Sequence, residues 1–478
     1  MSMSLVVALL AAVLIPCAVL AEDPPTEVWA RTFDLGSDDW GEEIAVDNAG
    51  FVYVTGNTYN GADYDWLTIK YDANGDTVWA RVYDSGGGED IANGVAVDDM
   101  GNVYVVGWTQ DNAIHDWRMT KYDPSGVLEW DRIRDWAADV DQGCHDIVVD
   151  NAGGHLYMLG DYIGAGGTWD YLTVVCDLDG NFLGENGWSG GASVNNNGWA
   201  ITLDDSLNIY VSGIVWNATR DWGTVKYRPN LTLDWSVVYD SGAEESICPT
   251  AIAVDHTGCV FLVGWVENAT TDWQIVKYSP AGAFIWDMTV DTLGADEGAW
   301  GIEIDDAGHM YVNGDFDTGT GWDCRTIKCD LDGNMQWDVT YDGGSNYNDA
   351  GRGLAIDDSG YVYVVGHSYN GTTVDYLVIK YAQQTGIAEH SAADRSGVAG
   401  LEVIGNPSSA PVLKCTLPAG VKATLSIYSI DGRRIESFSV NSSQSTFAWK
   451  PSGLASGVYF GRLDLGSQSI SAKICLTK

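Results

Sequence analysis

The chain has 478 residues, of which 67 are acidic and 24 basic, and its formal net charge at neutral pH is −43. A charge of this sign repels nucleic acid phosphates and anionic membrane surfaces, so we expect no nucleic acid partner, whereas cations, neutral sugars or basic proteins remain suitable partners. The composition, with 57 Gly, 21 Trp and 24 Tyr, favours strands and turns over helices.

The N-terminal segment has the pattern of an export signal. Residues 5–20 are almost entirely apolar, a run too short for a comfortable transmembrane helix. A polar stretch begins at Glu22, so the pattern predicts a secretory signal peptide over residues 1–21, cut after Ala21, although no Lys or Arg precedes the apolar run. No later stretch is apolar enough to span a bilayer, and we therefore expect an exported mature chain without a transmembrane segment.

Residues 78–126 contain one complete structural unit. Their two-residue alternation predicts four strands, at residues 78–83, 95–98, 103–107 and 116–122. Tight turns separate some of these runs, because Gly101 and Gly126 can adopt positive φ and the preceding Asp residues cap their own turns. Longer polar loops separate the others, and the unit is expected to be one four-stranded antiparallel sheet.

Similar units follow one another along the chain. Each has an Asp that ends a short apolar run, and these residues are 50–54 positions apart: Asp47, Asp98, Asp150, Asp204, Asp255, Asp305 and Asp357. A period of this length predicts a seven-bladed β-propeller, here over residues 22–382. The strand at residues 28–33 has no repeat in front of it, and the last repeat lacks an outer strand. The N-terminal strand is therefore expected to complete the last blade and close the ring.

The repeated phrase Ala-Val-Asp-x-x-Gly-Asn-x-Tyr-Val-x-Gly, close to residues 96–107 and in modified form 355–366, resembles the secreted bacterial β-propeller repeat family and, more distantly, NHL-type propellers. The resemblance covers about three quarters of the chain. It implies extracellular display and binding surfaces built from repeats, and it supplies no shared catalytic residue.

A second domain is expected after a polar linker at residues 383–400. Residues 401–478 alternate in several short runs and predict a small C-terminal β-sandwich, which makes the fold class all-β. The phrases at residues 427–433, 454–460 and 473–478 resemble the type A sorting domain of the type IX secretion system. That resemblance implies the outer-membrane secretion machinery as a partner and a secreted or outer cell-surface location in a Gram-negative bacterium. The alternative is a generic sandwich spacer.

The candidate ligand-binding residues lie where the predicted long loops share one face of the propeller. An aromatic residue follows a strand-ending Gly by one to three positions in every repeat: Tyr59, Trp108, Tyr162, Trp216, Trp265, Phe316 and Tyr369. Acidic residues, among them Asp38 with Asp39 and Glu89 with Asp90, precede the innermost strands on the same face. Aromatic rings among carboxylates suit a carbohydrate or a cation. Alternatively, these aromatics only cap the packing between blades.

The sequence contains no catalytic or metal-binding pattern. The seven His residues occupy different places in different repeats, and no Cys/His spacing is typical of zinc. The Asp/Asn clusters at residues 72–76, 177–181 and 330–334 lack the length of an EF-hand loop, so we expect no cofactor, although so acidic a surface allows adventitious calcium binding. Of the cysteines, only Cys415 and Cys475 form a pair worth testing for a disulfide.

These observations predict a secreted or cell-surface binding module that uses the acidic, aromatic-lined loop face and recognises a carbohydrate or a surface protein. Two alternatives stay open. One is an extracellular enzyme acting on polysaccharide, a glycosidase or a lyase, and the other is a structural surface or adhesion component.

Overall fold

The computed structural model describes residues 22–478 except 112–113, 135–141, 164–166, 191–194, 217–218, 243–244, 268–269, 292–294, 345–347, 384–399, 405–411, 418–421, 430–432, 441–443, 450–453, 455–456, 465–468 and 477–478. The predicted signal peptide lies outside the described residues. The regular elements of the described part are all β-strands, which confirms the all-β fold class, and no helix there could cross a membrane. Two compact units divide after Gln383.

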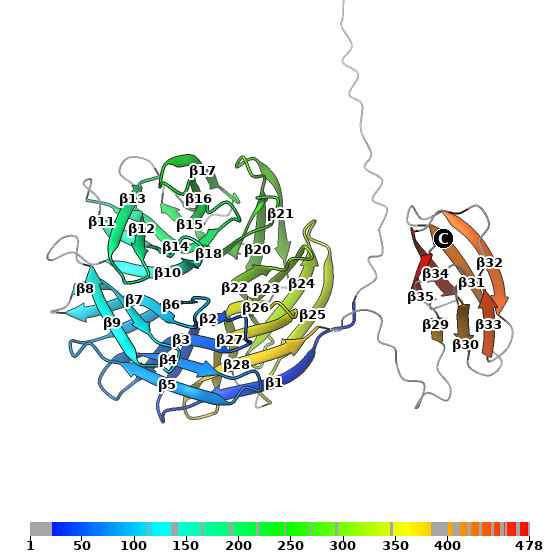
Figure 1. Cartoon of the computed structure of the whole chain (residues 1–478), viewed down its shortest axis with the longest axis horizontal. Coiled ribbons are helices and arrows are strands. Elements are labelled where there is room, and N and C mark those ends of the chain that lie inside the picture. Colours follow the sequence, from blue (N-terminus) through cyan, green and yellow to red (C-terminus); the bar gives the residue numbers. More distant parts are fainter. Residues whose placement is uncertain are drawn as a thin grey trace, which may run out of the picture. The chain divides into compact units, whose positions relative to one another are not determined.

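The first unit consists of seven four-stranded antiparallel sheets, or blades, around a common centre (Figure 1). Blades 1 to 3 are β2 (Asp39–Val46), β3 (Val52–Tyr59), β4 (Tyr64–Tyr71), β5 (Thr77–Tyr83); β6 (Asp90–Val97), β7 (Val103–Asp111), β8 (Ile114–Tyr122), β9 (Leu128–Arg134); and β10 (Gly143–Asp150), β11 (His155–Ile163), β12 (Trp169–Asp177), β13 (Phe182–Trp188). Blades 4 and 5 are β14 (Asn196–Leu203), β15 (Ile209–Trp216), β16 (Arg220–Tyr227), β17 (Leu233–Tyr239); and β18 (Glu245–Val254), β19 (Val260–Glu267), β20 (Thr271–Tyr278), β21 (Phe284–Val290). Blade 6 is β22 (Glu297–Ile304), β23 (His309–Asp317), β24 (Trp322–Asp330) and β25 (Met335–Tyr341).

Blade 7 joins the two ends of this unit. It contains β26 (Asp349–Ile356), β27 (Tyr361–Tyr369) and β28 (Val374–Ala382), and its outermost strand is β1 (Thr26–Phe33). β1 pairs antiparallel with β28 from Thr26 opposite Ala382 to Phe33 opposite Tyr376. The first strand of each blade contacts the first strands of its two neighbours, so β2, β6, β10, β14, β18, β22 and β26 form the inner ring.

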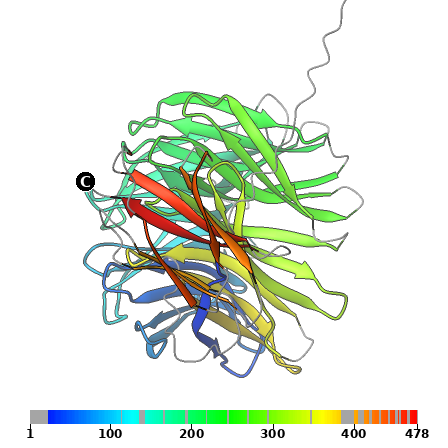
Figure 2. The same ribbon diagram turned by 90° about the vertical axis from the view of Figure 1, so that its right-hand side faces the viewer.

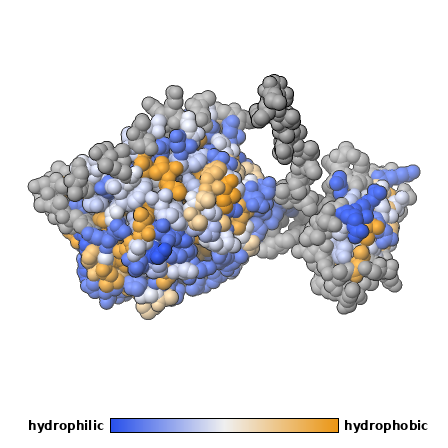
Figure 3. All heavy atoms as spheres, turned by 90° about the horizontal axis from the view of Figure 1, so that it is seen from above, coloured by the Kyte–Doolittle hydropathy of each residue, from blue (hydrophilic) through white to orange (hydrophobic). Residues whose placement is uncertain are grey.

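The hydrophobic core lies between blades. One buried cluster joins Val54 and Leu67 of blade 1 to Val365 and Tyr376 of blade 7, and other clusters join the later blades in the same way. Because both faces of each sheet are covered, the second and third strands are almost wholly buried. Exposed apolar residues are scattered among polar ones on the side shown in Figure 3.

The repeated polar residues brace this scaffold. Asp98 Oδ1 accepts hydrogen bonds from the N–H groups of its own turn, and Tyr104 donates its hydroxyl to Oδ2 at 3.0 Å. The ammonium group of Lys70 lies 4.9 Å from the Tyr53 ring and donates at 3.2 Å to the carbonyl of Pro124 in the next blade. These contacts are those of a scaffold, since they join strands and neighbouring blades.

The second unit contains two sheets. β29 (Gly400–Ile404), β30 (Val412–Thr416) and β33 (Gln444–Ala448) form one, and β31 (Ala423–Ser429), β32 (Arg434–Val440), β34 (Gly457–Asp464) and β35 (Ser469–Leu476) form the other (Figure 2, orange to red). Leu413 and Cys415 of the first sheet share a buried cluster with Leu425 and Ile427 of the second. Cys415 is unbridged, and the side chain of Cys475 lies outside the described residues.

Candidate functional site: the central channel

All seven inner strands contain a β-bulge at the same position. In β2 the pairing jumps from Gly41 opposite Gly56 to Glu43 opposite Thr55, which leaves Glu42 without a partner in the ladder. The same jump occurs in the other six inner strands. A bulge of this kind redirects a side chain. The seven bulge residues line a central channel of about 680 Å³: Glu42, Asn93, His145, Trp199, Thr250, Trp300 and Arg352.

The bulge residues differ from blade to blade, whereas the positions around them repeat. The residue opposite the start of each bulge is always Gly, and a Cβ on Gly107 would come within 1.9 Å of the carbonyl oxygen of Ile91. The scaffold therefore fixes the backbone at the bulge but leaves the side chain free to vary. This ring is where a chain built from repeats can place distinct chemistry.

Several members of the ring contact one another across blades. The guanidinium of Arg352 lies 3.9 Å from the centroid of the Trp300 ring, and Trp300 donates its indole N–H to Asp315 Oδ2 at 3.2 Å. On another side of the channel, the His145 ring lies 4.9 Å from that of Trp199. His145 Nε2 also lies 3.4 Å from Asp161 Oδ2. These contacts hold two indoles in defined positions in the channel wall.

Four carboxyl groups line the same channel: Glu42, Glu43, Asp146 and Glu303. Burial raises the pKa of Asp146 to about 7. The N–H groups of Ile201 and Ile147, which donate to its carboxylate at 2.8 and 2.7 Å, lower the pKa by a smaller amount. Burial, assisted by the charge of Asp146, also raises the pKa of Glu303 to about 7. The pKa of Glu43 is also raised, by burial and then by the charge of Asp146. The channel therefore holds carboxyl groups that are partly protonated near neutral pH.

Two arginines, Arg220 and Arg352, line the same channel, and Arg352 acts on its acidic groups. Burial raises the pKa of Glu42, and the positive charge of Arg352 partly offsets that rise. Burial and then Arg352 lower the pKa of His367 to about 3, so this imidazole, which lies 4.4 Å from the Trp40 ring, is neutral at physiological pH. The channel wall thus combines acidic, aromatic and cationic side chains around the ring.

The structure does not bring the seven predicted aromatics into one ring. Trp265 lines the channel. Trp108 packs on His115 with ring centroids 4.2 Å apart, Tyr59 lies 5.3 Å from Tyr64, and the Arg220 guanidinium lies 4.2 Å from the Trp216 ring. Alternate residues of a strand point to opposite sides, so aromatics one, two and three positions after the Gly cannot share one direction.

The remaining three predicted aromatics lie at strand ends. Phe316 has the Arg325 guanidinium 5.6 Å from its ring centroid. Tyr162 is partly buried against the cluster that joins blades 2 and 3. The Tyr369 N–H donates to the Asn348 carbonyl at 2.9 Å. None of these three aromatics is among the residues that line the channel.

The predicted acidic residues of the loop face do not share one environment. Asp39 and Asp90 are fully buried at the starts of inner strands, whereas Asp38 Oδ1 accepts a hydrogen bond from the Val374 N–H at 3.0 Å. The acidic residues at 139, 141 and 244 lie outside the described residues. The exposed turn at residues 72–76 has Asp72 Oδ1 bound to its own backbone, at 2.9 Å from the N–H groups of both Asn74 and Asp76, as expected for a structural turn.

Sequence reasoning missed the bulge ring. Its only signal is a variable position between two repeated ones, and a repeat comparison treats such a position as drift. The bulge itself leaves no mark in hydrophobic alternation, since one extra residue only shifts the pattern within a short strand.

The fold and the channel define the class of this chain as a repeat β-propeller. Its sequence matches the "Beta-propeller repeat" family model over residues 34–65, 85–113 and 339–371, and the "Secretion system C-terminal sorting domain" model over residues 406–477. Together these matches identify a secreted β-propeller protein with a sorting tail. No curated protein matches the chain.

Solved propellers are similar in fold at low identity. The WD40 domain of Toxoplasma gondii coronin is 8% identical with a TM-score of 0.47, and the match covers 76% of this chain and 89% of that one. The propeller domain of the Trilobed protease of Pyrococcus furiosus is 10% identical with a TM-score of 0.43, covering 71% and 97%. The periplasmic gluconolactonase PpgL of Pseudomonas aeruginosa is 11% identical with a TM-score of 0.46, covering 70% and 96%.

Proposed function

We propose that the propeller is a binding module displayed at the outer surface of a Gram-negative bacterium and that it takes a carbohydrate into the mouth of its central channel. The observation that carries this proposal is the bulge ring. Seven equivalent positions, whose side chains vary from blade to blade, converge on one cavity. Two of these side chains are tryptophans, and neighbouring side chains hold both in place.

The chemistry of the wall favours an uncharged or basic glycan. Indole faces stack on the apolar faces of sugar rings, and carboxylates accept hydrogen bonds from sugar hydroxyls. Trp199 is 38% exposed, so part of its surface is open to a ligand. The net charge of −43 opposes acidic polysaccharides.

Export completes the proposal. The predicted signal peptide would take the chain across the inner membrane, and the sorting tail would present it to the secretion machinery of the outer membrane. A chain that ends at residue 399 should then keep its propeller but fail to reach the cell surface, as measured by surface proteolysis of intact cells.

The binding test compares tryptophans inside and outside the channel. Trp199→Ala and Trp300→Ala should each weaken binding to the glycans that the intact protein selects on an array by about tenfold or more, because stacking on an indole is lost. Trp108→Ala is the matched control, since Trp108 packs on His115 and both residues lie outside the channel lining. Equal binding by all three variants would remove the channel as the site, and no binding by the intact protein would favour a structural surface component.

A polysaccharide-acting enzyme is the second candidate. The carboxyl groups of Asp146 and Glu303, with pKa values of about 7, are suited to general acid–base chemistry. Release of reducing sugar from the selected glycan, lost in Asp146→Asn, would favour it over binding alone.

A further inference from the structure

A second set of acidic residues recurs at the boundaries between blades, away from the bulge ring. It consists of an Asp at the start of a third strand, a residue just after the outer strand and a residue at the start of the next inner strand. Between blades 1 and 2 these are Asp65, Asp84 and Asp90. Between blades 6 and 7 they are Asp323, Asp342 and Asp349. We call each set a boundary trio.

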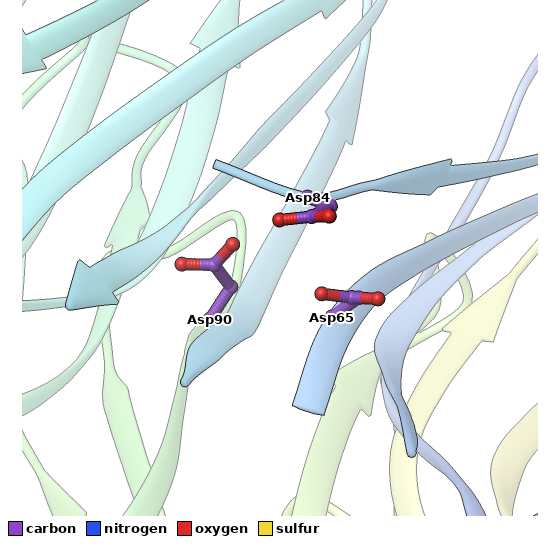
Figure 4. Close-up of side chains that lie close together, drawn as sticks. All are labelled: Asp65, Asp84 and Asp90. Atoms are coloured by element: carbon purple, nitrogen blue, oxygen red, sulfur yellow. The ribbon is translucent and has the colours of Figure 1, made fainter. Parts of the chain in front are cut away.

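The carboxylates of each trio converge on one point. In both, one oxygen from each residue lies within 4.8 Å of the other two. Figure 4 shows Asp65, Asp84 and Asp90 approaching one another from three different segments of chain. Asp65 is 4% exposed and Asp90 is fully buried, so water reaches the group mainly from the side of Asp84.

Asp65 has a buried oxygen that lacks a partner. Its Oδ2 accepts a hydrogen bond from Asn60 Nδ2 at 2.9 Å, whereas its Oδ1 is buried and has no hydrogen-bond partner. Such an atom normally has a donor or a cation beside it. The trio offers no donor, because ionised carboxylates are acceptors only.

At the first trio the positive charge of Arg118 acts on Asp90, although Arg118 forms its ion pair with Asp131. The second trio has no arginine in an equivalent position. No Lys or Arg in the described part of the chain forms an ion pair with any of its three carboxylates. Three such charges at this separation repel one another unless a cation lies between them.

Two other boundaries avoid this repulsion, one through an arginine and the other through loss of two acids. Between blades 5 and 6, Arg325 Nη1 lies 3.5 Å from Glu297 Oε2. Between blades 3 and 4, Ser189 and Asn196 replace two of the acids, and Asn196 Nδ2 lies 3.5 Å from Asp170 Oδ1. Arg325 pairs with Gly314, and the residues that pair with the equivalent glycines are Leu377 in blade 7 and Arg118 in blade 2. Arg118 forms an ion pair with Asp131 and with no member of the first trio.

We propose that each of the two boundary trios binds a calcium ion that joins neighbouring blades. The ligands on offer are all carboxylate oxygens, which suit a hard divalent cation and not zinc or copper. The ion would link the third strand of one blade to the first strand of the next at the loop face, and it would remove the repulsion inside each trio. This role is structural and is independent of what the channel binds.

Variants at the exposed members test the proposal without disturbing the core. Asp84 Oδ1 and Asp342 Oδ1 each cap a turn, by accepting from the N–H groups of Gly86 at 2.6 Å and Gly344 at 2.8 Å. Asn keeps such a cap, so Asp84→Asn and Asp342→Asn remove one charge each while the turn persists. Asp240→Asn is the matched control. Asp240 caps the same turn through Gly242, but the sequence has Ile247 at the third position of its trio.

The measurements are calcium calorimetry on the full mature chain at physiological salt and thermal melts in calcium and in EDTA. The intact protein should bind at least two calcium ions and melt higher in calcium than in EDTA. Asp84→Asn and Asp342→Asn should each lose one bound ion or weaken it about tenfold, and each should melt higher than the intact protein in EDTA, because a repulsive charge is gone. Asp240→Asn should keep the full stoichiometry.

Two results would overturn the inference. One is an intact protein whose melting temperature and calorimetric trace do not change with calcium. The other is calcium binding that persists unchanged when Asp84→Asn and Asp342→Asn are combined, which would place the ions elsewhere on the acidic surface.

Discussion

At the scale of single residues, the channel carboxyls link stability to pH. Glu303 has an ordinary pKa of 4.5 and a folded-state pKa of about 7, so folding takes up a proton between these two values. Ionisation above this window costs the folded state free energy, and the stability due to this group therefore falls as pH rises from about 4.5 to about 7. Asp146 acts with the same sign.

Glu303→Gln isolates this effect. At pH 8 the variant should be more stable than the intact protein by up to about 3 kcal/mol, while at pH 5 the two should differ by less than about 1 kcal/mol. Denaturant unfolding at both pH values measures the difference, in which the contributions of other groups cancel. Glu267→Gln, at an exposed glutamate, is the matched control. If the free energy of unfolding changes with pH by the same amount in the intact protein and in Glu303→Gln, the raised pKa of Glu303 is contradicted.

At the scale of the strand, the bulge explains the repeated glycine of each blade. The inner strand places a carbonyl oxygen where a Cβ of the second strand would stand, at 1.9 Å for Gly107 and Gly160 and 1.8 Å for Gly366. The strand cannot move away, because it is paired on both sides and buried. The glycine is therefore required by close approach of two backbones rather than by an unusual φ.

Gly107→Ala should destabilise the propeller by about 2–4 kcal/mol, because the bulge must shift to admit a methyl group. Gly184→Ala is a matched control in a strand, where the new Cβ would meet only the flexible Leu231 side chain at 3.3 Å. Thermal or urea unfolding of the two variants gives the comparison. If Gly107→Ala lowers the free energy of unfolding no more than Gly184→Ala does, the bulge can shift at little cost and the prediction is wrong.

At the scale of the whole molecule, β1 holds the ring together. Its Trp29 is 6% exposed in the cluster between blades 7 and 1 and donates its indole N–H to the Ala73 carbonyl in blade 1 at 3.1 Å. Trp79 and Trp235 make the equivalent bond to Pro124 and Pro280 in the next blade. Each blade is a separate sheet, and these outer-strand tryptophans connect one blade to the next.

Trp29→Ala should cost about 3–5 kcal/mol and broaden the unfolding transition, because it opens the junction between the last blade and the first. The neighbouring Val28→Ala, at a side chain that is 48% exposed, should cost less than about 0.5 kcal/mol. Calorimetry gives both the midpoint and the width. An equally sharp and equally hot transition for Trp29→Ala would show that stability does not depend on this junction.

The sequence predicted the propeller because its blades repeat the same turn and strand residues, such as Asp98 with Gly101. It could not predict which loop-face residues gather at a site, because Trp108 and Trp265 follow a Gly at the same spacing and only Trp265 lines the channel. Asp65, Asp84 and Asp90 lie in different segments of the chain, so no short sequence motif contains all three members of the trio.

The amino-acid sequence by itself determined the repeat, the number of blades and the sorting tail, because local alternation and turn chemistry act within a few neighbouring residues. Only the tertiary structure decided what faces the channel and what meets between blades. A bulge redirects Glu42, Trp199 and Trp300 inward, and ring closure brings together carboxylates that lie far apart along the chain, which are effects of backbone geometry and not of residue pattern.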